Sequence, residues 1–208
     1  MLFTKTVEPG TFSLLKDLML MPELSDFCLV GGTALSLRHG HRISIDLDLF
    51  STEPKDFLSL GDFLEKKFNK DYESEKPDLS FALFSRINNI KTDFVYYPHK
   101  LIAPIETIDG IRLYSDKDIA AMKINAILGR GVKKDFFDLF QLLQVYTLEE
   151  IIAWHKEKFP SQMLLISIPN SIIYFEDAEQ SPDPVSLSKQ SWEDVKTFLQ
   201  LKVREYLN

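Results

Sequence analysis

The stretch 29–50 constrains the fold more than any other, because a double glycine in it is followed by two aspartates one residue apart. Residues 27–30 form a short apolar run that stops at Gly31-Gly32, which indicates a buried strand ending in a tight turn. A helix is expected to start at Thr33. Backbone N–H groups at such a turn and helix N-terminus can cradle a phosphate, and glycine permits positive φ and close approach.

A second strand is expected over residues 43–50, and it carries both aspartates. Side chains alternate along a strand, so Asp46 and Asp48 share one face, with their Cα atoms about 6.5–7 Å apart. Two carboxylates at this spacing can converge on a divalent cation, and without one their like charges on an apolar strand are costly. Mg²⁺ is the expected ion, with Mn²⁺ as the alternative. An exposed edge strand with acids outside and leucines inside remains open, but the upstream glycines favour the metal site.

Composition limits the remaining classes of protein. The 208 residues are 45% hydrophobic and 26% charged, which is ordinary for a soluble globular chain. The net charge of −7 argues against broad electrostatic binding to nucleic acid, although a local basic groove is compatible with it. The sole cysteine, Cys28, lies in a predicted buried strand, and no signal peptide or membrane span is recognisable. We therefore expect a cytoplasmic protein.

The remaining pattern predicts strands followed by helices, with a boundary near residue 114. Residues 1–114 would form the sheet domain and 115–208 a helical lobe. The expected strands are 79–87 and 90–97 around an Asn88-Asn89 turn, and a hairpin-like connection over 105–114. The expected helices are 11–21, 54–68, 115–130, 133–143, 147–158, 162–176 with a break or kink at Pro169, and 191–206 after a loop at 181–188.

Between the two halves of the opening stretch lies a basic segment that ends at Arg42. A guanidinium that enters a strand beside two aspartates can pair with them or bind a phosphate. His39 and His41 might suggest a metal site, but no cysteine or further histidine stands at ligand spacing. Arg42 is therefore the better functional candidate.

Charged residues also recur on two helices of the predicted lobe. Lys123 and Arg130 are seven residues apart and share a helix face, so they could line a phosphate-binding cleft, although single cations are usually solvated surface. Asp135 and Asp138 share a face of the following helix, where acidic residues at the N-terminus also complement the helix dipole. The residues alone leave both alternatives open.

These motifs together resemble a known superfamily. Gly31-Gly32, thirteen residues and Asp46-Leu47-Asp48 resemble the signature of the polymerase-beta-type nucleotidyltransferases. The fuller string G-G-T-A-L-S-L-x-x-G-H-R-x-S-x-D-L-D-L-F is similar to the AbiEii/AbiGii-type toxins of bacterial abortive-infection and toxin–antitoxin systems. Later motifs, K-x-x-A-I-L-x-R and K-K-D-F-F-D-L, resemble the same family in the same order, and the resemblance covers nearly the whole chain. Many superfamily members have Gly-Ser where this chain has Gly-Gly; Thr33 could supply the hydroxyl.

The resemblance implies the fold and several residue roles. The fold would be α/β (α+β): a polymerase-beta-like mixed sheet with flanking helices, followed by a helical C-terminal lobe that closes the nucleotide cleft. Asp93, in the string K-T-D-F-V-Y-Y-P, matches the third carboxylate of the superfamily, a metal ligand and general base. By itself it would be taken for an edge residue or a turn partner. Lys123 would hold phosphates, Lys134 and Asp138 would complete the pocket, and Arg130 and Asp135 would be structural.

The implied activity is an Mg²⁺-dependent transfer of a nucleoside monophosphate from an NTP to an acceptor hydroxyl, on a tRNA end or a protein. A cognate antitoxin protein would silence it. The expected metal ligands are Asp46, Asp48 and Asp93, joined in catalysis by Lys123 and Asp138; the expected nucleotide-binding residues are Gly31, Gly32, Thr33, Arg42, Lys123 and Lys134. Two alternatives stay open: a nucleotide-binding module without turnover, and a transferase with a small-molecule acceptor, with which the acidic net charge is compatible.

Overall fold

The computed structural model describes residues 1–74 and 81–208. By its internal contacts the chain divides into two compact units. The sheet unit comprises Met1–Arg38, Ser44–Lys100 and Ile105–Tyr114. The helical unit comprises His39–Ile43, Leu101–Pro104 and Ser115–Asn208. Two short segments from the first half of the chain thus belong to the helical unit.

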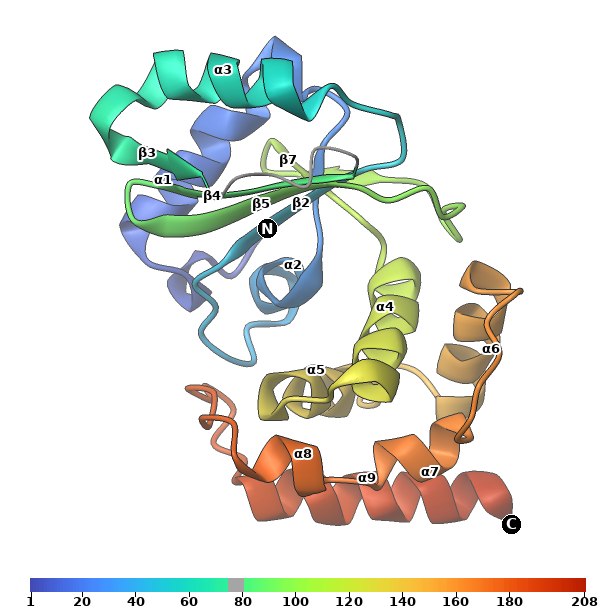
Figure 1. Ribbon diagram of the computed structural model, residues 1–208. Helices are drawn as coiled ribbons and strands as arrows, with labels where there is room; N and C mark the ends of the chain where they lie inside the picture. Colours follow the sequence, from blue (N-terminus) through green and yellow to red (C-terminus); the bar gives the residue numbers. More distant parts are fainter. Residues whose placement is uncertain (75–80) are drawn as a thin grey trace. The chain divides into compact units, whose positions relative to one another are not determined.

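The sheet unit is built on a mixed sheet, as the sequence predicts (Figure 1). Over the described residues its strand order is β3-β4-β5-β2-β1-β7-β6. The β2–β5 and β1–β7 pairs are parallel and the other pairs antiparallel. The strands are β1 (Cys28–Leu29), β2 (Leu47–Ser51), β3 (Tyr72–Ser74), β4 (Ala82–Ile87), β5 (Ile90–Tyr96), β6 (Glu106–Ile108) and β7 (Ile111–Leu113).

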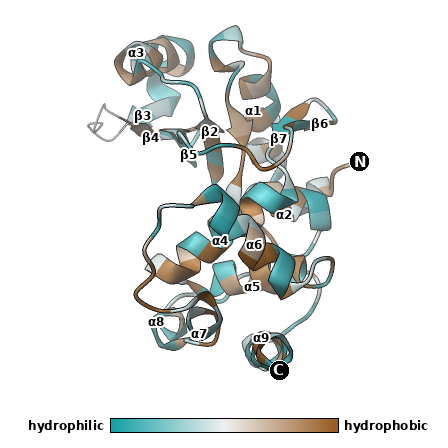
Figure 2. Cartoon of the chain, turned by 90° about the vertical axis from the view of Figure 1, so that its right-hand side faces the viewer, coloured by the Kyte–Doolittle hydropathy of each residue, from teal (hydrophilic) through white to brown (hydrophobic). Residues whose placement is uncertain are grey.

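Helices cover the two faces of this sheet unequally. α1 and α3 lie on one face and α2 on the other (Figures 1 and 2). Side chains alternate between the two faces along each strand, so Leu83 and Phe94 point towards the face that α1 and α3 cover, and both are buried there. Asp56 caps α3 by accepting hydrogen bonds from two backbone N–H groups. The helices of this unit are α1 (Pro9–Met19), α2 (Gly31–His39) and α3 (Phe57–Phe68), with 3-10 turns at Thr4–Thr6, Pro22–Leu24 and Asn69–Asp71.

The helical unit packs α4 against α5, α6 and α7, and α9 against α5, α6 and α7. Apolar and polar residues alternate along these helices, as the ribbon colours show (Figure 2). Ser115, Thr147 and Ser191 each cap a helix through their hydroxyl groups, which fixes three of the helix starts. The helices are α4 (Asp116–Gly129), α5 (Lys133–Leu142), α6 (Leu148–Lys158), α7 (Ile168–Ile172), α8 (Glu176–Glu179) and α9 (Trp192–Leu207).

Two predicted elements are wrong in extent. The helix predicted over 162–176 is reduced to α7 and the start of α8, because Pro169 stands in the first turn of α7 and begins that helix instead of kinking a longer one. The strand predicted over 43–50 begins only at Leu47; before it, backbone groups of Ile43 and Ser44 bond to Val185 and Thr6 instead of a strand ladder. Residues 79–80 of the predicted strand 79–87 lie outside the described residues.

Within the described part of the chain, none of the helices combines the length and apolar character needed to cross a bilayer.

The charged groups that the helical unit buries are paired. Lys158 Nζ lies 2.7 Å from Asp118 Oδ1, and both side chains have no exposed surface. Asp118 also accepts hydrogen bonds from the backbone N–H groups of Ile102 and Ala103. This pair therefore joins α4, α6 and the segment Leu101–Pro104.

Replacing Lys158 with methionine should destabilise the helical unit by about 3–5 kcal/mol, because Asp118 would be left as a buried, incompletely paired charge. The measurement is denaturant unfolding followed by tryptophan fluorescence, since Trp154 and Trp192 both lie in this unit. Lys202→Met is the control, because Lys202 pairs with Glu205 on the surface of α9. Equal unfolding midpoints for the two variants would contradict the importance of the buried pair.

Candidate active site

Two of the predicted carboxylates lie side by side in the sheet. β2 and β5 run parallel with Asp48 and Asp93 as direct partners, so their Cα atoms are separated by about one strand spacing, ~4.8 Å. Leu47 and Leu49 are buried on the opposite face, while Asp46 and Asp48 are half-buried. Asp46 comes one residue before β2 and continues the alternation. The three carboxylates therefore share the face of the sheet that α1 and α3 leave uncovered.

The turn after β1 brings backbone close to this face. Gly31 has φ +69°, and a Cβ atom placed on it would lie 2.7 Å from Asp48 Oδ2. No other residue fits there without moving the carboxylate, which is the physical reason for glycine at this position. Gly31 also begins α2, so the helix N-terminus adjoins Asp48.

Thr33 positions the segment that leads into β2. Its buried hydroxyl donates to the backbone carbonyl of Asp46 and lies 2.8 Å from Ser44 Oγ. In this structure the hydroxyl thus holds Asp46 in place, and its predicted contact with a nucleotide stays a prediction. Gly32 is buried next to it in the first turn of α2.

Asp93 is the most enclosed of the three carboxylates. Asp93 is 6% exposed, and its Oδ1 has no hydrogen-bond partner among the described residues. Oδ2 pairs with Lys91 Nζ at 2.8 Å. Burial lowers the pKa of Lys91, but the hydrogen bond and the charges of Asp93, Asp48 and Asp46 outweigh it and raise that pKa above its ordinary value. Lys91 was not among the residues that the sequence singled out, although its position two before Asp93 on a strand predicts a shared face.

The side chains of Asp46, Asp48 and Asp93 provide oxygen donors, the type that a hard divalent cation prefers. They are carboxylates, one of their buried oxygens lacks a partner within the described chain, and the missing side chain of Gly31 makes room for the Asp48 carboxylate. No three His, Cys, Asp or Glu side chains of the described ranges are already gathered around one point. Binding would therefore require the carboxylates to turn towards a common centre.

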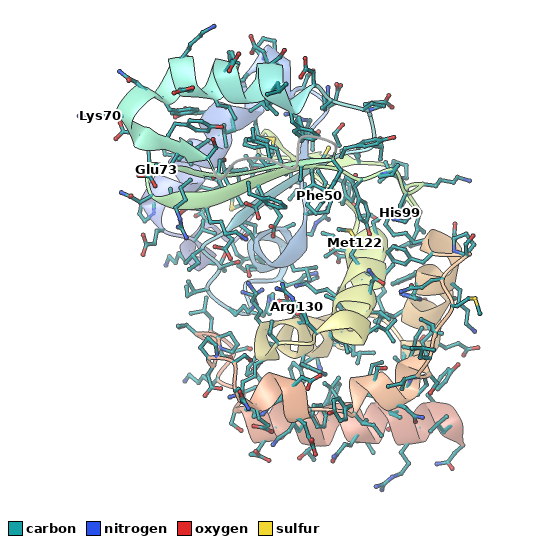
Figure 3. All side chains as sticks on the ribbon, viewed as in Figure 1. Phe50, Lys70, Glu73, His99, Met122 and Arg130 are labelled. Carbon is teal, nitrogen blue, oxygen red and sulfur yellow. The ribbon has the colours of Figure 1, made fainter. Side chains whose placement is uncertain are left out.

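An aromatic strip continues the same face towards the end of β5. The rings of Phe50 and Tyr97 have centroids 5.1 Å apart, and those of Tyr97 and His99 4.5 Å apart. Figure 3 labels Phe50 and His99 at this end of the sheet. Sequence reasoning missed the strip because Tyr97 and His99 lie beyond the strand, where alternation alone does not place side chains. Such rings are suited to stacking on a planar base.

The other predicted residues gather in the helical unit, around Asp138. Its carboxylate accepts from Arg42 Nε at 2.7 Å and Nη2 at 2.8 Å, and from His41 Nε2 at 2.7 Å. Lys123 Nζ lies 2.7 Å from Asp138 Oδ2 and 2.8 Å from Asp135 Oδ1. All five side chains are buried. The cluster holds the segment His39–Ile43 against α4 and α5.

These contacts govern the protonation states in the cluster. Burial opposes ionisation of Asp138, but the charges of Arg42 and Lys123 and the hydrogen bonds from His41 and Arg42 hold its pKa well below the ordinary value. Burial is also the largest influence on His41 and lowers its pKa, against the opposing effect of its hydrogen bond to Asp138. His41 is therefore neutral, and its Nε2–H donates to Asp138.

The predicted site residues thus form two groups. The sheet unit contains Gly31, Gly32, Thr33, Asp46, Asp48 and Asp93. The helical unit contains Arg42, Lys123, Asp138 and Lys134, which is exposed near the start of α5. The ammonium of Lys123 is neutralised by two carboxylates in this structure, and its predicted contact with phosphates stays a prediction, as do the roles of Lys134 and Arg42.

Gly31→Ala should weaken Mn²⁺ binding in the presence of a non-hydrolysable NTP analogue, because the new Cβ would displace the Asp48 carboxylate. Gly110→Ala is the matched control: Gly110 has φ +83°, but nothing lies within 4 Å of its Cβ position. Both variants should lose about 1–2 kcal/mol of stability from the left-handed backbone. The spectroscopically measured Mn²⁺ affinity should fall about tenfold or more in the first alone. Equal affinities would show that Asp48 is not held for a metal.

The free energy of unfolding of the helical unit should fall as pH drops below about 6.5, because the unfolded chain protonates His41 at its ordinary pKa and the folded chain only at lower pH. Protonation of Asp138 should add a second loss below about pH 4, where only the unfolded carboxyl takes up a proton. Denaturant unfolding from about pH 7 to about pH 2 measures both losses. His41→Gln, which retains a donor for Asp138, should flatten the slope between pH 6.5 and 5; an unchanged slope would contradict the neutral assignment.

Comparison with known proteins shows the family of the chain. The family model described as "Nucleotidyl transferase AbiEii toxin, Type IV TA system" matches residues 13–194. The Aquifex aeolicus (strain VF5) protein aq_aa25 is 37% identical over 189 residues, covering 88% of this chain and 89% of that protein.

Solved structures show the same fold. A candidate nucleotidyltransferase from H. pylori aligns with TM-score 0.56 at 16% identity, covering 97% of this chain and 99% of that one. MenT4, a nucleotidyltransferase toxin from Mycobacterium tuberculosis H37Rv, aligns with TM-score 0.55 at 15% identity, covering 95% and 86%. With the family model spanning most of its length, the chain belongs to the AbiEii family of nucleotidyltransferase toxins.

Proposed function

We propose that this chain transfers a nucleoside monophosphate from an NTP to an acceptor hydroxyl, using Mg²⁺ or Mn²⁺ held by Asp46, Asp48 and Asp93. One observation carries the proposal: Asp48 and Asp93 are direct partners on parallel strands, with Asp46 on the same face. Like charges this close are unfavourable unless a cation neutralises them. The bound metal would neutralise phosphate charge and orient the triphosphate.

The turn at Gly31-Gly32 supports the same activity. The N–H groups at the start of α2 adjoin Asp48, so a triphosphate that reaches the carboxylates would also reach the positive end of a helix dipole. The strip of Phe50, Tyr97 and His99 offers a surface on which a base of the nucleotide or acceptor can stack.

Asp93 is suited to accept the proton of the acceptor hydroxyl, since its Oδ1 is buried without a partner in the described chain. The acceptor oxygen then bonds to the α-phosphorus, and the bond from that phosphorus to the oxygen bridging to the β-phosphate breaks. Pyrophosphate leaves with the electron pair, and Asp93 returns the proton to solvent. The sheet unit's residues would thereby position both reacting oxygens.

The acceptor and the partner follow from the family and not from the geometry. A tRNA end or a protein hydroxyl is the expected acceptor, and the type IV toxin–antitoxin family points to a cognate antitoxin that restrains the enzyme. With a net charge of −7, binding of a large RNA would have to rely on local cations.

Label transfer tests the proposal. Purified protein should move label from one of the four α-labelled NTPs, with Mg²⁺, into RNA or protein of a cell extract. Asp48→Asn should reduce the transfer at least about 100-fold, because metal stabilisation of phosphoryl charge is worth several kcal/mol. Asp62→Asn is the matched control, because Asp62 lies on α3, outside the carboxylate face.

The possible outcomes separate the alternatives. Label in a macromolecule with wild type and Asp62→Asn, and its loss in Asp48→Asn, supports the proposal and names nucleotide and acceptor. Pyrophosphate release without labelled macromolecule would point to a small-molecule acceptor. NTP binding with no pyrophosphate release would contradict catalysis and leave a nucleotide-binding module.

A further inference from the structure

Four charged residues occupy a two-by-two patch on β2, the residue that precedes it, and β5. The register pairs Asp48 with Asp93 and Leu47 with Thr92. Continued back by one residue, it places Asp46 beside Lys91. Since residues two apart on a strand share a face, three carboxylates and one ammonium lie together on the uncovered side of the sheet. The ammonium therefore stands where the proposed function needs a metal cation.

The ammonium makes a direct contact within this patch. Lys91 Nζ lies 2.8 Å from Asp93 Oδ2, while the side chain of Lys91 is 47% exposed and that of Asp93 8% exposed. The charges of Asp48 and Asp46 act on Lys91 as well. A cation that entered the patch would meet this ammonium as a like charge and would compete with it for Asp93 Oδ2.

We propose that Lys91 is a resident counter-ion of the carboxylate site, which neutralises Asp93 in the metal-free protein and must be displaced when a divalent cation binds. This inference rests on the proposed function and adds to it a positioning residue. It also agrees with the position of Asp93, which Lys91 holds while the acidic side chains of the described chain are not yet gathered around one point.

The surroundings give Lys91 room to leave. A hollow of about 210 Å³ opens beside Lys91 and Asp93, with Phe84, Arg86 and Glu73 also lining it. Figure 3 labels Glu73 on β3, two strands away from β5. A displaced ammonium can turn into this solvated space without disturbing the buried Leu83–Phe94 face of the sheet.

Displacement has a consequence for the reaction. A divalent cation alone must compete with the tethered ammonium, whereas a cation that arrives with a triphosphate brings anionic oxygens that can pair with the released Lys91. Lys91 would thus weaken metal binding to the empty enzyme and favour its joint binding with the NTP.

The test is a titration of the full chain with Mn²⁺ alone, in which free Mn²⁺ is counted by electron paramagnetic resonance. Lys91→Gln should bind Mn²⁺ roughly tenfold more tightly than wild type, the order expected when a like charge a few ångströms away is removed from a partly solvated site. Lys91→Arg, which retains the charge, should behave as wild type.

Arg86→Gln is the matched control, because Arg86 is the cross-strand partner of Lys91 and is exposed on the same face. It should change the Mn²⁺ affinity less than about twofold. Thermal unfolding of each variant checks that the fold is kept. A structural role for Lys91 would predict unchanged or weaker binding in Lys91→Gln, and either result overturns the inference.

Label transfer by the wild-type protein, measured in parallel, distinguishes failure of the Lys91 counter-ion role from failure of the proposed function. Metal-dependent transfer together with an unchanged Mn²⁺ affinity in Lys91→Gln would reject the counter-ion role alone. Absence of transfer together with absence of Mn²⁺ binding in every variant would reject the proposed function and, with it, this inference.

Discussion

The adjacency of Asp48 and Asp93 on parallel strands is the constraint on which the candidate site depends. Two carboxylates one strand spacing apart repel each other, and burial of Asp93 makes its charge costlier still. The Lys91 ammonium and the positive end of the α2 dipole offset this negative charge. The first residue of α2 is a glycine because the Asp48 carboxylate occupies the space that a side chain would need. The proposed divalent cation would neutralise these carboxylates further.

The helical unit manages charge in a different way. Asp138 is surrounded by three cationic or donor side chains and has no exposed surface, and Asp118 is likewise enclosed with Lys158. Such buried pairs contribute little net stability compared with apolar packing, but removal of one partner is costly. They therefore fix which segments lie together: His39–Ile43 on α4 and α5, and Leu101–Pro104 on α4 and α6.

The sequence predicted the features that depend on residues close together along the chain. The alternation of Asp46, Leu47 and Asp48 and the Asn88-Asn89 turn both appear in the structure, and both asparagines have positive φ. The mixed sheet and its nucleotidyltransferase fold followed from the motif order. Contacts between distant residues could not be predicted in this way: Arg42 and Asp138 are 96 positions apart, and nothing local tells that the guanidinium forms a bidentate pair there. The roles of the candidate site residues stay predictions.

Anomalous scattering from Mn²⁺ in crystals soaked with a non-hydrolysable NTP analogue would test the central claim most directly. The account predicts a Mn²⁺ peak about 2.0–2.2 Å from oxygens of Asp48 and Asp93, with the triphosphate at the start of α2. A bound nucleotide with no metal on these carboxylates, or a metal held elsewhere in the chain, would contradict it.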